Sequence, residues 1–363
     1  MASFTFLFIF FQCLFFLIIS ITAAAQKPPL APALYVFGDS LLDSGNNNFL
    51  PTIAKVNYLP YGANFPQGPT GRFTNGKTVA DFIAEFLGLP YSPPYLGSKN
   101  SVPVTGLNYA SGACGILPKT GRQIGKCLNL GEQIDLFAKT VQSMLSIHFN
   151  NDLGKLSGYL SKSIAIISIG NNDYFSDYFD TNSSDTSRRL GPEPYAQLLL
   201  DNLSRLLQKL YNIGARKIIM FDIGPLGCTP YITRKYEHNG QCDEDKNQIV
   251  QYFNNRLASM LTDLTTTLKG SNFVLGHSHR LGYDAAINPS RYGLRDTRNP
   301  CCTTWSNGTS VCIPLSKPCP NANEYYFWDG YHLTEALYSL IASSCIDDKS
   351  FCVPLNLKDL VNI

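Results

Sequence analysis

The sequence carries little charge and no marked excess of either sign. Its 363 residues include 29 Lys and Arg against 27 Asp and Glu, which gives a formal net charge of +2. A nucleic-acid groove needs Lys and Arg clustered on one face. The one local basic cluster, at residues 188–189, follows an acidic stretch and is typical of solvated surface. We therefore expect no nucleic-acid partner.

Several other signals are absent. The chain has no internal repeats, no low-complexity tracts and no composition typical of a linker between domains. The Gly- and Pro-rich stretch at residues 222–230 lacks the Gly-Lys-Ser/Thr of a phosphate-binding loop. Beyond residue 21, no apolar run is long enough to cross a bilayer. These absences favour a single soluble domain over residues 26–363.

The amino terminus has the features of a secretory signal peptide. Residues 4–21 are almost wholly apolar, and the alanines at 23–25 form a small-residue cleavage site. We expect residues 1–25 to be removed and the mature protein to be secreted, to the cell exterior or wall. A retained signal anchor is the alternative, because no basic residue precedes the apolar run and its length is within reach of a membrane span.

The cysteine count agrees with export. One of the 11 cysteines, Cys13, lies in the leader, and the remaining even number predicts disulfides formed in an oxidising compartment. We expect local pairs Cys114–Cys127, Cys228–Cys242 and Cys345–Cys352, with Cys301, Cys302, Cys312 and Cys319 pairing among themselves. A zinc site in this last group is the weaker alternative, because the group has no matched Cys-x-x-Cys pair.

Three acceptor sequons fit a secreted glycoprotein. They begin at Asn182, Asn202 and Asn307. The first and third lie in polar, loop-like sequence and should be accessible. Asn202 falls within a helical pattern, so its use depends on the face that it occupies.

Apolar runs alternate with amphipathic stretches along the chain. Strands are predicted at residues 34–37, 104–110, 163–169, 216–221 and 271–275, and helices at 78–87, 131–149, 193–211, 243–269 and 335–341. Strands separated by helices form parallel sheets with helices on both faces. The predicted fold is therefore a three-layer α/β/α sandwich with a central, mainly parallel five-stranded sheet.

Ser40 follows the first predicted strand in a Gly-Asp-Ser turn. Open α/β sheets place their chemistry at the carboxyl ends of the strands. A serine there becomes an acyl-transfer nucleophile if a base takes its proton and amide groups face the oxyanion. The alternative is an ordinary turn or helix-capping serine, since Gly, Asp and Ser are common turn residues.

His332 is the only one of five histidines with an aspartate three positions before it. Asp329 can therefore hold the far nitrogen of the imidazole, which leaves the near nitrogen free to accept a proton from serine. The alternative makes Asp329 a helix cap and His332 a first-turn residue.

Four short motifs together resemble the plant GDSL esterase/lipase family within the SGNH hydrolases. They are GDSLLDSGN at residues 38–46, NYASG at 108–112, GNND at 170–173 and DGYH at 329–332. The resemblance extends over nearly everything after the leader. It implies a flavodoxin-like SGNH hydrolase fold and hydrolysis of acyl or lipid esters.

The resemblance also implies roles for single residues. Ser40 would be the nucleophile, His332 its base, and Asp329 the carboxylate that completes the triad. Gly112 would supply a backbone oxyanion donor and Asn172 a side-chain donor, each at the end of a predicted strand. No metal or organic cofactor is needed, and we expect a monomer that acts on a small-molecule or lipid acyl ester.

The sequence departs from the family pattern at two places. Residues 112–115 are Gly-Ala-Cys-Gly where most plant relatives have Gly-Gly-Ala-Gly, which brings a disulfide close to the pocket. Leu333 stands where many relatives have proline, which would set the first helical position.

Two local patterns admit more than one interpretation. The family-like stretch at 70–76 predicts either a binding role for Arg72 or a stable turn that leaves Arg72 solvated. His277 and His279 would share one face of a strand, but two histidines without a third ligand make a weak metal site, and we expect none.

The same catalytic residues would serve an acyltransferase that passes the acyl group to another acceptor. A third reading is a secreted binding or defence protein with a vestigial site.

Overall fold

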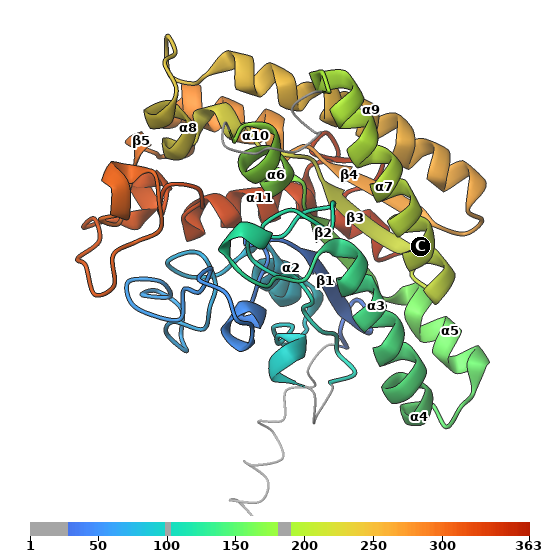
Figure 1. The fold of residues 1–363 in the computed structure, drawn as a ribbon. Helices are drawn as coiled ribbons and strands as arrows, with labels where there is room; N and C mark the ends of the chain where they lie inside the picture. Colours follow the sequence, from blue (N-terminus) through green and yellow to red (C-terminus); the bar gives the residue numbers. More distant parts are fainter. Residues whose placement is uncertain (1–27, 99–102, 181–189) are drawn as a thin grey trace, which may run out of the picture.

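The computed structural model describes residues 28–98, 103–180 and 190–363. Its centre is a five-stranded sheet in the order β1-β2-β3-β4-β7 (Figure 1). The first four strands are parallel, and β7 pairs antiparallel with β4. The strands are β1 Leu34–Gly38, β2 Ile164–Ser168, β3 Lys217–Phe221, β4 Asn272–Gly276 and β7 Cys352–Val353. The predicted signal peptide and Asn182 lie outside the described residues.

Helices cover both faces of the sheet. Successive residues of a strand point to opposite faces, so Tyr35 and Phe37 join one hydrophobic cluster and Leu34 and Val36 the other. The first cluster is completed by α3 (Leu130–Thr140), α7 (Pro192–Ile213) and α9 (Glu244–Thr267). The second is completed by α2 (Val79–Leu87), α11 (Glu335–Asp347) and α12 (Leu357–Leu360). The predicted three-layer sandwich is confirmed.

Two of the core helices begin at reciprocal capping boxes. Thr78 and Asp81 form the box of α2, and Asn129 and Glu132 form the box of α3. Each box satisfies amide donors that a helix start would leave unpaired. At the other end of α2, Gly88 adopts φ 71°, which suits a residue without a Cβ.

The predicted strand at 104–110 is wrong. The segment runs beside β1, where the Val36 amide donates to the Leu107 carbonyl, but only Asn108 forms an isolated bridge. Gly106 has φ 116°, and the Asn108 side chain donates to the Leu42 carbonyl across the turn after β1. The Ala110 amide donates to the Asn108 side-chain oxygen, so this backbone donor is not free to join a regular ladder. The fifth strand is instead the two-residue β7, which is too short to leave a periodic signal.

The remaining helices and strands complete the fold. They are α4 (Ser146–His148), α5 (Leu153–Lys162), α6 (Asn171–Asp173), α8 (Pro230–Lys235), α10 (Ser278–Ile287), β5 (Asp296–Pro300) and β6 (Tyr325–Phe327). The expectation of a strand through His277 and His279 is wrong, because β4 ends at Gly276 and α10 follows at once. Within the described ranges, no helix combines the length and apolarity needed to cross a membrane.

All ten cysteines outside the leader are paired. The three predicted local disulfides form, and the remaining four cysteines form two more. These last two bonds are Cys301–Cys319 and Cys302–Cys312. Because metal binding needs free thiolates, this group is not a zinc site.

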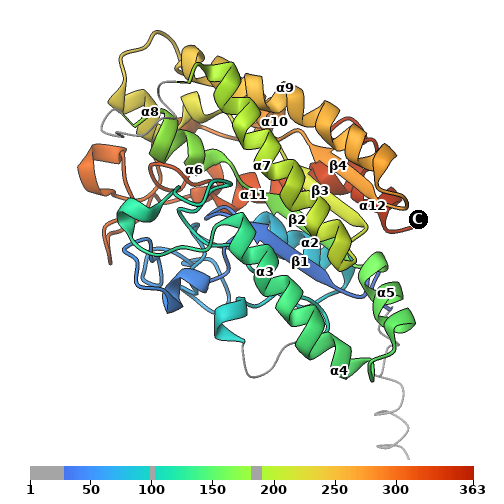
Figure 2. The ribbon, with the colours of Figure 1, turned by 45° about the vertical axis from the view of Figure 1, so that its right-hand side comes forward.

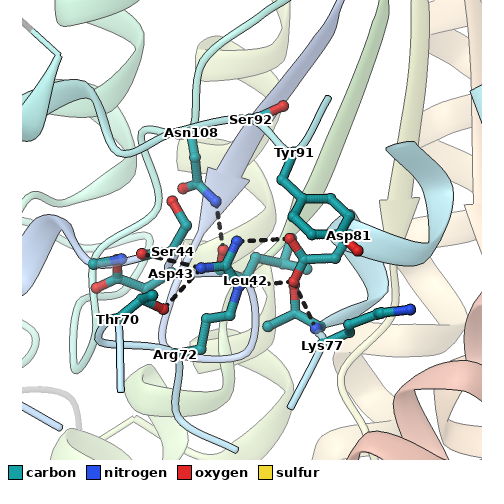
Figure 3. Close-up of polar contacts among 12 residues, drawn as sticks. Leu42, Asp43, Ser44, Thr70, Arg72, Lys77, Asp81, Tyr91, Ser92 and Asn108 are labelled. Carbon is teal, nitrogen blue, oxygen red and sulfur yellow. Dashed lines mark hydrogen bonds and ion pairs between the residues drawn. The ribbon is translucent and has the colours of Figure 1, made fainter. Parts of the chain in front are cut away.

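The long loop after β1 is tied to α2 by a buried ion pair (Figure 3). The Arg72 guanidinium donates to both carboxylate oxygens of Asp81, at 2.8 and 2.7 Å, and to the hydroxyl of Thr70. Its plane also lies 4.2 Å from the ring centroid of Phe65. Arg72 is 5% exposed, so the prediction of a solvated side chain is wrong. Its role is to hold the loop in place.

Candidate active site

Ser40 lies at the carboxyl end of β1, in a turn that is fixed by the residue two positions earlier. Gly38 has φ 146°, and a Cβ there would lie 2.2 Å from the carbonyl oxygen of Ser168 on β2. Only glycine fits so close to the neighbouring strand. From α3, the buried Gln133 side chain accepts from the Gly38 amide and donates to its carbonyl, both at 2.8 Å. The serine is thereby held at the rim of the sheet.

Ser40, His332 and Asp329 form one hydrogen-bonded chain. The Ser40 Oγ lies 2.8 Å from His332 Nε2, and His332 Nδ1 lies 2.8 Å from Asp329 Oδ2. A carboxylate only accepts, so the ring hydrogen facing Asp329 is on Nδ1 and the Nε2 lone pair faces the serine hydroxyl. The residues Ser40, His332 and Asp329 are 8%, 6% and 0% exposed, respectively. In this arrangement His332 can accept a proton from Ser40.

Two aromatic residues to which the sequence assigned no role support this hydrogen-bonded chain of side chains. The buried Tyr61 hydroxyl donates to Asp329 Oδ2 at 2.6 Å and accepts from the Cys312 amide at 3.0 Å. The Phe73 ring packs against the His332 ring at a centroid distance of 4.9 Å. Both residues come from the irregular loop after β1, where no periodicity distinguishes a buried aromatic side chain from an exposed one.

His332 is not part of the terminal helix. It lies between β6 and α11, and the cap residue of α11 is Thr334. Leu333 forms an isolated bridge with Phe327 instead of taking the first helical position. Residue 333 is therefore not the first helical position that a proline would set. Tight turn bonds hold Asp329 and His332, since Asp329 Oδ1 accepts from the His332 amide at 2.8 Å.

The Gly112 amide, predicted to donate to the oxyanion, already has a hydrogen-bond acceptor within the protein. It donates to Asp43 Oδ2 at 3.0 Å. Glycine is required here by packing, because a Cβ would lie 2.6 Å from the Phe73 ring. The next residue, Ala113, has φ 70° and lines the cavity beside Ser40. Its amide has no hydrogen-bond acceptor among the described residues.

Asn172, the predicted side-chain oxyanion donor, lies beside the cavity. It follows β2 in the short helix α6 and lines the same cavity as Ser40. Its amide nitrogen donates one hydrogen to the Cys114 carbonyl at 3.0 Å. A side-chain amide carries two hydrogens, so the second can serve a ligand. The Cys114–Cys127 disulfide thus borders the site, as the sequence departure at 112–115 predicts.

Three fully buried carboxylates organise the loops around the site. Asp39 accepts from the Asn171 side chain, Asp43 from the amides of its own turn, and Asp173 from the amides at 116–117. Burial disfavours the charged form, and it raises the pKa of each of these three carboxyls to about 6. Near neutral pH each group is therefore mostly charged. The hydrogen bonds offset only part of the free-energy cost of desolvating that charge.

A cavity of about 410 Å³ opens at Ser40 and His332. Its inner wall lies between the sheet and the helices α2 and α11 and is mostly apolar, formed by Leu42, Val79, Phe221, Tyr326, Phe327 and Ile341. Its outer wall comes from loops and includes Ile53, Ala54, Gln123, Ile124, Ser310 and Val311. Figure 2 shows the loops after β1 and after β5 at the same end of the sheet. An apolar cavity with a few polar groups suits a small organic or lipid ligand.

His277 and His279 lie on either side of Ser278, which lines the cavity. His277 Nδ1 lies 3.6 Å from the buried Asp222, and His279 Nδ1 lies 2.8 Å from the Gln251 side chain. Burial lowers the pKa of His279 to about 4, which keeps it neutral. In the part of the chain that the structure describes, no three His, Cys, Asp or Glu residues are grouped to hold a metal.

Comparison with known proteins identifies the family. Residues 34–344 match the family model described as GDSL-like Lipase/Acylhydrolase. The chain belongs to this family. GDSL esterase/lipase 7 of Arabidopsis thaliana is 43% identical over 341 residues, which cover 92% of this chain and 93% of the relative. GDSL esterase/lipase At1g33811 of the same plant is 38% identical over 345 residues, covering 93% of each.

The GDSL family assignment confirms the resemblance found in the four motifs and makes the chain a carboxylic ester hydrolase. A solved phospholipase A1 from Streptomyces albidoflavus aligns with 86% of this GDSL chain and 99% of its own, at 16% identity and a TM-score of 0.40. That likeness is too weak to bear on function.

Proposed function

We propose that this GDSL protein hydrolyses acyl esters through a covalent acyl-enzyme on Ser40. His332 takes the serine proton as Oγ attacks the acyl carbonyl, then delivers it to the leaving alcohol. Asp329 keeps the Nδ1 hydrogen in place and stabilises the imidazolium. Water then attacks the acyl-enzyme by the same route. The observation that carries the proposal is the unbroken chain of 2.8 Å contacts from Ser40 to Asp329 beside an apolar cavity.

The oxyanion would be held by donors on three separate turns. The Ser40 amide has no acceptor among the described residues, and the Asn172 side chain keeps one hydrogen for a ligand. The family likeness assigns the third donor to Gly112, whose amide is engaged by Asp43. The Ala113 amide supports the role better, since it is unengaged within the described chain and its residue lines the cavity. Such donors stabilise the charge that develops on the carbonyl oxygen.

The substrate proposed is a lipid or other ester with an apolar acyl group. The inner wall of the cavity presents Leu42, Val79 and Ile341 to such a chain. Burying an acyl chain there gains about 0.8 kcal/mol for each methylene removed from water. We expect kcat/KM to rise with chain length until the chain fills the cavity.

Export and modification belong to the same proposal. Residues 1–25 would be removed as a signal peptide, and the five disulfides agree with an oxidising destination. Asn307 is exposed in the short 3-10 helix Trp305–Gly308 and is the better glycosylation candidate of the two described sequons. Asn202 lies within α7 and donates to the Leu198 carbonyl of the same helix. The mature chain, residues 26–363, would act as a monomeric single domain.

The proposal is tested by hydrolysis of p-nitrophenyl esters of increasing chain length. The wild-type protein should release p-nitrophenol and be labelled at Ser40 by an organophosphonate, whereas Ser40→Ala should retain only background activity. An unlabelled wild-type protein that binds but does not turn over esters would favour a vestigial site. Analysis of products in the presence of alcohol acceptors separates hydrolysis from acyl transfer.

A further inference from the structure

Three loops form the outer rim of the cavity. The first rim loop is residues 44–60, the second 113–126 and the third 310–319, and each contributes residues to the outer wall. Backbone bonds join them: the Ile53 amide donates to the Ile124 carbonyl, and the Leu315 amide donates to the Leu59 carbonyl. Disulfides at Cys312 and Cys319 anchor the third loop. The rim is therefore a preformed, continuous edge around the mouth.

Exposed aliphatic side chains stand on this rim. Ile53 and Leu315 are each 81% exposed, and Leu59 is 45% exposed. Leu315 also has φ 60°, a left-handed conformation that is costly for a branched side chain and that asparagine or glycine would adopt more easily. Neither burial nor backbone preference explains a leucine there. Backbone outliers of this kind often mark functional positions.

The rim also differs from the rest of the chain in charge. The three loops contain no Asp or Glu, although acidic residues almost equal basic ones overall. They carry five basic residues, Lys55, Lys119, Arg122, Lys126 and Lys317. Of these, Lys55, Arg122, Lys126 and Lys317 form no ion pair with another described residue. Asp180, which also lines the cavity, belongs to none of these loops. Unpaired basic groups beside exposed aliphatic ones suit an anionic lipid surface.

We propose that the three rim loops dock the cavity mouth onto an anionic lipid surface. Leu59, Leu315 and Ile53 enter the interface between headgroups and acyl chains, and the rim Lys and Arg side chains contact the anionic headgroups. The cavity then opens directly into the lipid, so an acyl ester reaches Ser40 without crossing bulk water. The inference rests on the proposed function only for this last step, because docking itself needs no catalysis.

The test measures co-sedimentation of the Ser40→Ala protein with lipid vesicles, which leaves the lipid intact. Vesicles with about 30 mol% phosphatidylserine should bind the protein at least tenfold more tightly than phosphatidylcholine vesicles, and added salt should weaken the binding. Lys126→Glu with Lys317→Glu should reduce the affinity about thirtyfold or more. The matched control, Lys162→Glu with Lys269→Glu, changes two exposed lysines at the opposite end of the sheet and should leave binding unchanged.

The apolar half of the rim is tested with Leu59→Ser and Leu315→Asn together. Asparagine accepts the left-handed backbone at 315, so this change should preserve the melting temperature while vesicle binding falls about tenfold. The control is Ile147→Ser with Leu153→Ser, two residues that are 71% and 74% exposed near the α4–α5 turn. When the same two rim changes are made in the protein that keeps Ser40, the rate of hydrolysis of a soluble p-nitrophenyl ester should equal that of wild type.

Equal vesicle binding by rim and control variants would overturn the proposal. So would binding that does not depend on anionic lipid. If vesicles are not bound but the charge-reversed rim loses affinity for polygalacturonate, the rim recognises a soluble polyanion instead of a lipid surface. Failure of the proposed hydrolysis would be seen separately, as an inactive wild-type protein on soluble esters.

Discussion

Asp173 provides a test of how the buried carboxylates affect stability. It is wholly buried after β2 and accepts from the Ile116 amide at 2.8 Å, the Leu117 amide at 3.0 Å and the Thr120 hydroxyl at 2.7 Å. Despite these donors, burial raises the pKa of its carboxyl from 3.8 to about 6, with the neighbouring Asp177 adding to the rise. The free-energy cost of desolvating the charged carboxylate therefore exceeds the stabilisation that the hydrogen bonds give it.

The sign of the pH effect follows from proton binding. Between the unfolded and folded pKa values the folded protein holds more protons than the unfolded chain. The group therefore contributes stability that is present at low pH and is lost as the pH rises through about 6. For one such carboxyl, the loss between about pH 5 and pH 7.5 is about 1.4 kcal/mol.

Asp173→Asn removes this titration. We expect the free energy of unfolding of the variant, minus that of wild type, to be about 1.4 kcal/mol larger at about pH 7.5 than at about pH 5, so that the variant gains relative stability as the pH rises. The absolute difference at either pH depends on how well the amide fits the three donors, but the change with pH does not. Asp39, Asp43 and His279 titrate in both proteins, so their contributions cancel.

Urea unfolding followed by tryptophan fluorescence at the two pH values measures this quantity, with the disulfides kept oxidised. Asp201→Asn, an exposed position on α7, controls for the loss of one carboxylate. A difference between Asp173→Asn and wild type that is independent of pH, or that favours the variant more at the lower pH, would refute the reasoning.

Three further substitutions test the supports of the site. Arg72→Met leaves the Asp81 carboxylate buried and unpaired and should lower the free energy of unfolding by about 3–5 kcal/mol in urea titrations. Tyr61→Phe removes the hydroxyl that donates to Asp329 and should cost about 1.5–3 kcal/mol in the same assay. Asn172→Ala should lower kcat on p-nitrophenyl esters about a hundred- to thousandfold with little change in KM, because the donor acts on the oxyanion.

Each of these changes has a contrasting variant. Tyr58→Phe removes a neighbouring hydroxyl that donates to the Cys312 carbonyl, not to the aspartate, and should cost about 1 kcal/mol or less. Asn172→Asp keeps the side-chain size but removes the donors, so it should be as inactive as the alanine variant. For Arg72, restored stability in Arg72→Met with Asp81→Leu would show that the unpaired charge causes the loss. Stable, fully active single variants would contradict the assigned roles.

The local features of the chain were set by its sequence alone. Apolar periodicity predicts the buried strands β1 to β4 apart from their ends, and the amphipathic stretches predict α2, α7 and α9. Spacing along the chain also predicts three of the five disulfides, because closing a small loop needs few residues to come together. The motifs single out Ser40 and His332, which the structure places in contact.

Tertiary structure alone decided which partners those residues meet. Tyr61 lies 268 positions from Asp329 along the chain, yet its hydroxyl bonds the carboxylate. The Gly112 amide donates to Asp43, and the Asn108 side chain donates to the Leu42 carbonyl across the turn after β1. Such choices depend on which donors and acceptors are buried together, since each buried polar group must find a partner wherever the fold brings one. No pattern of neighbouring residues carries that information.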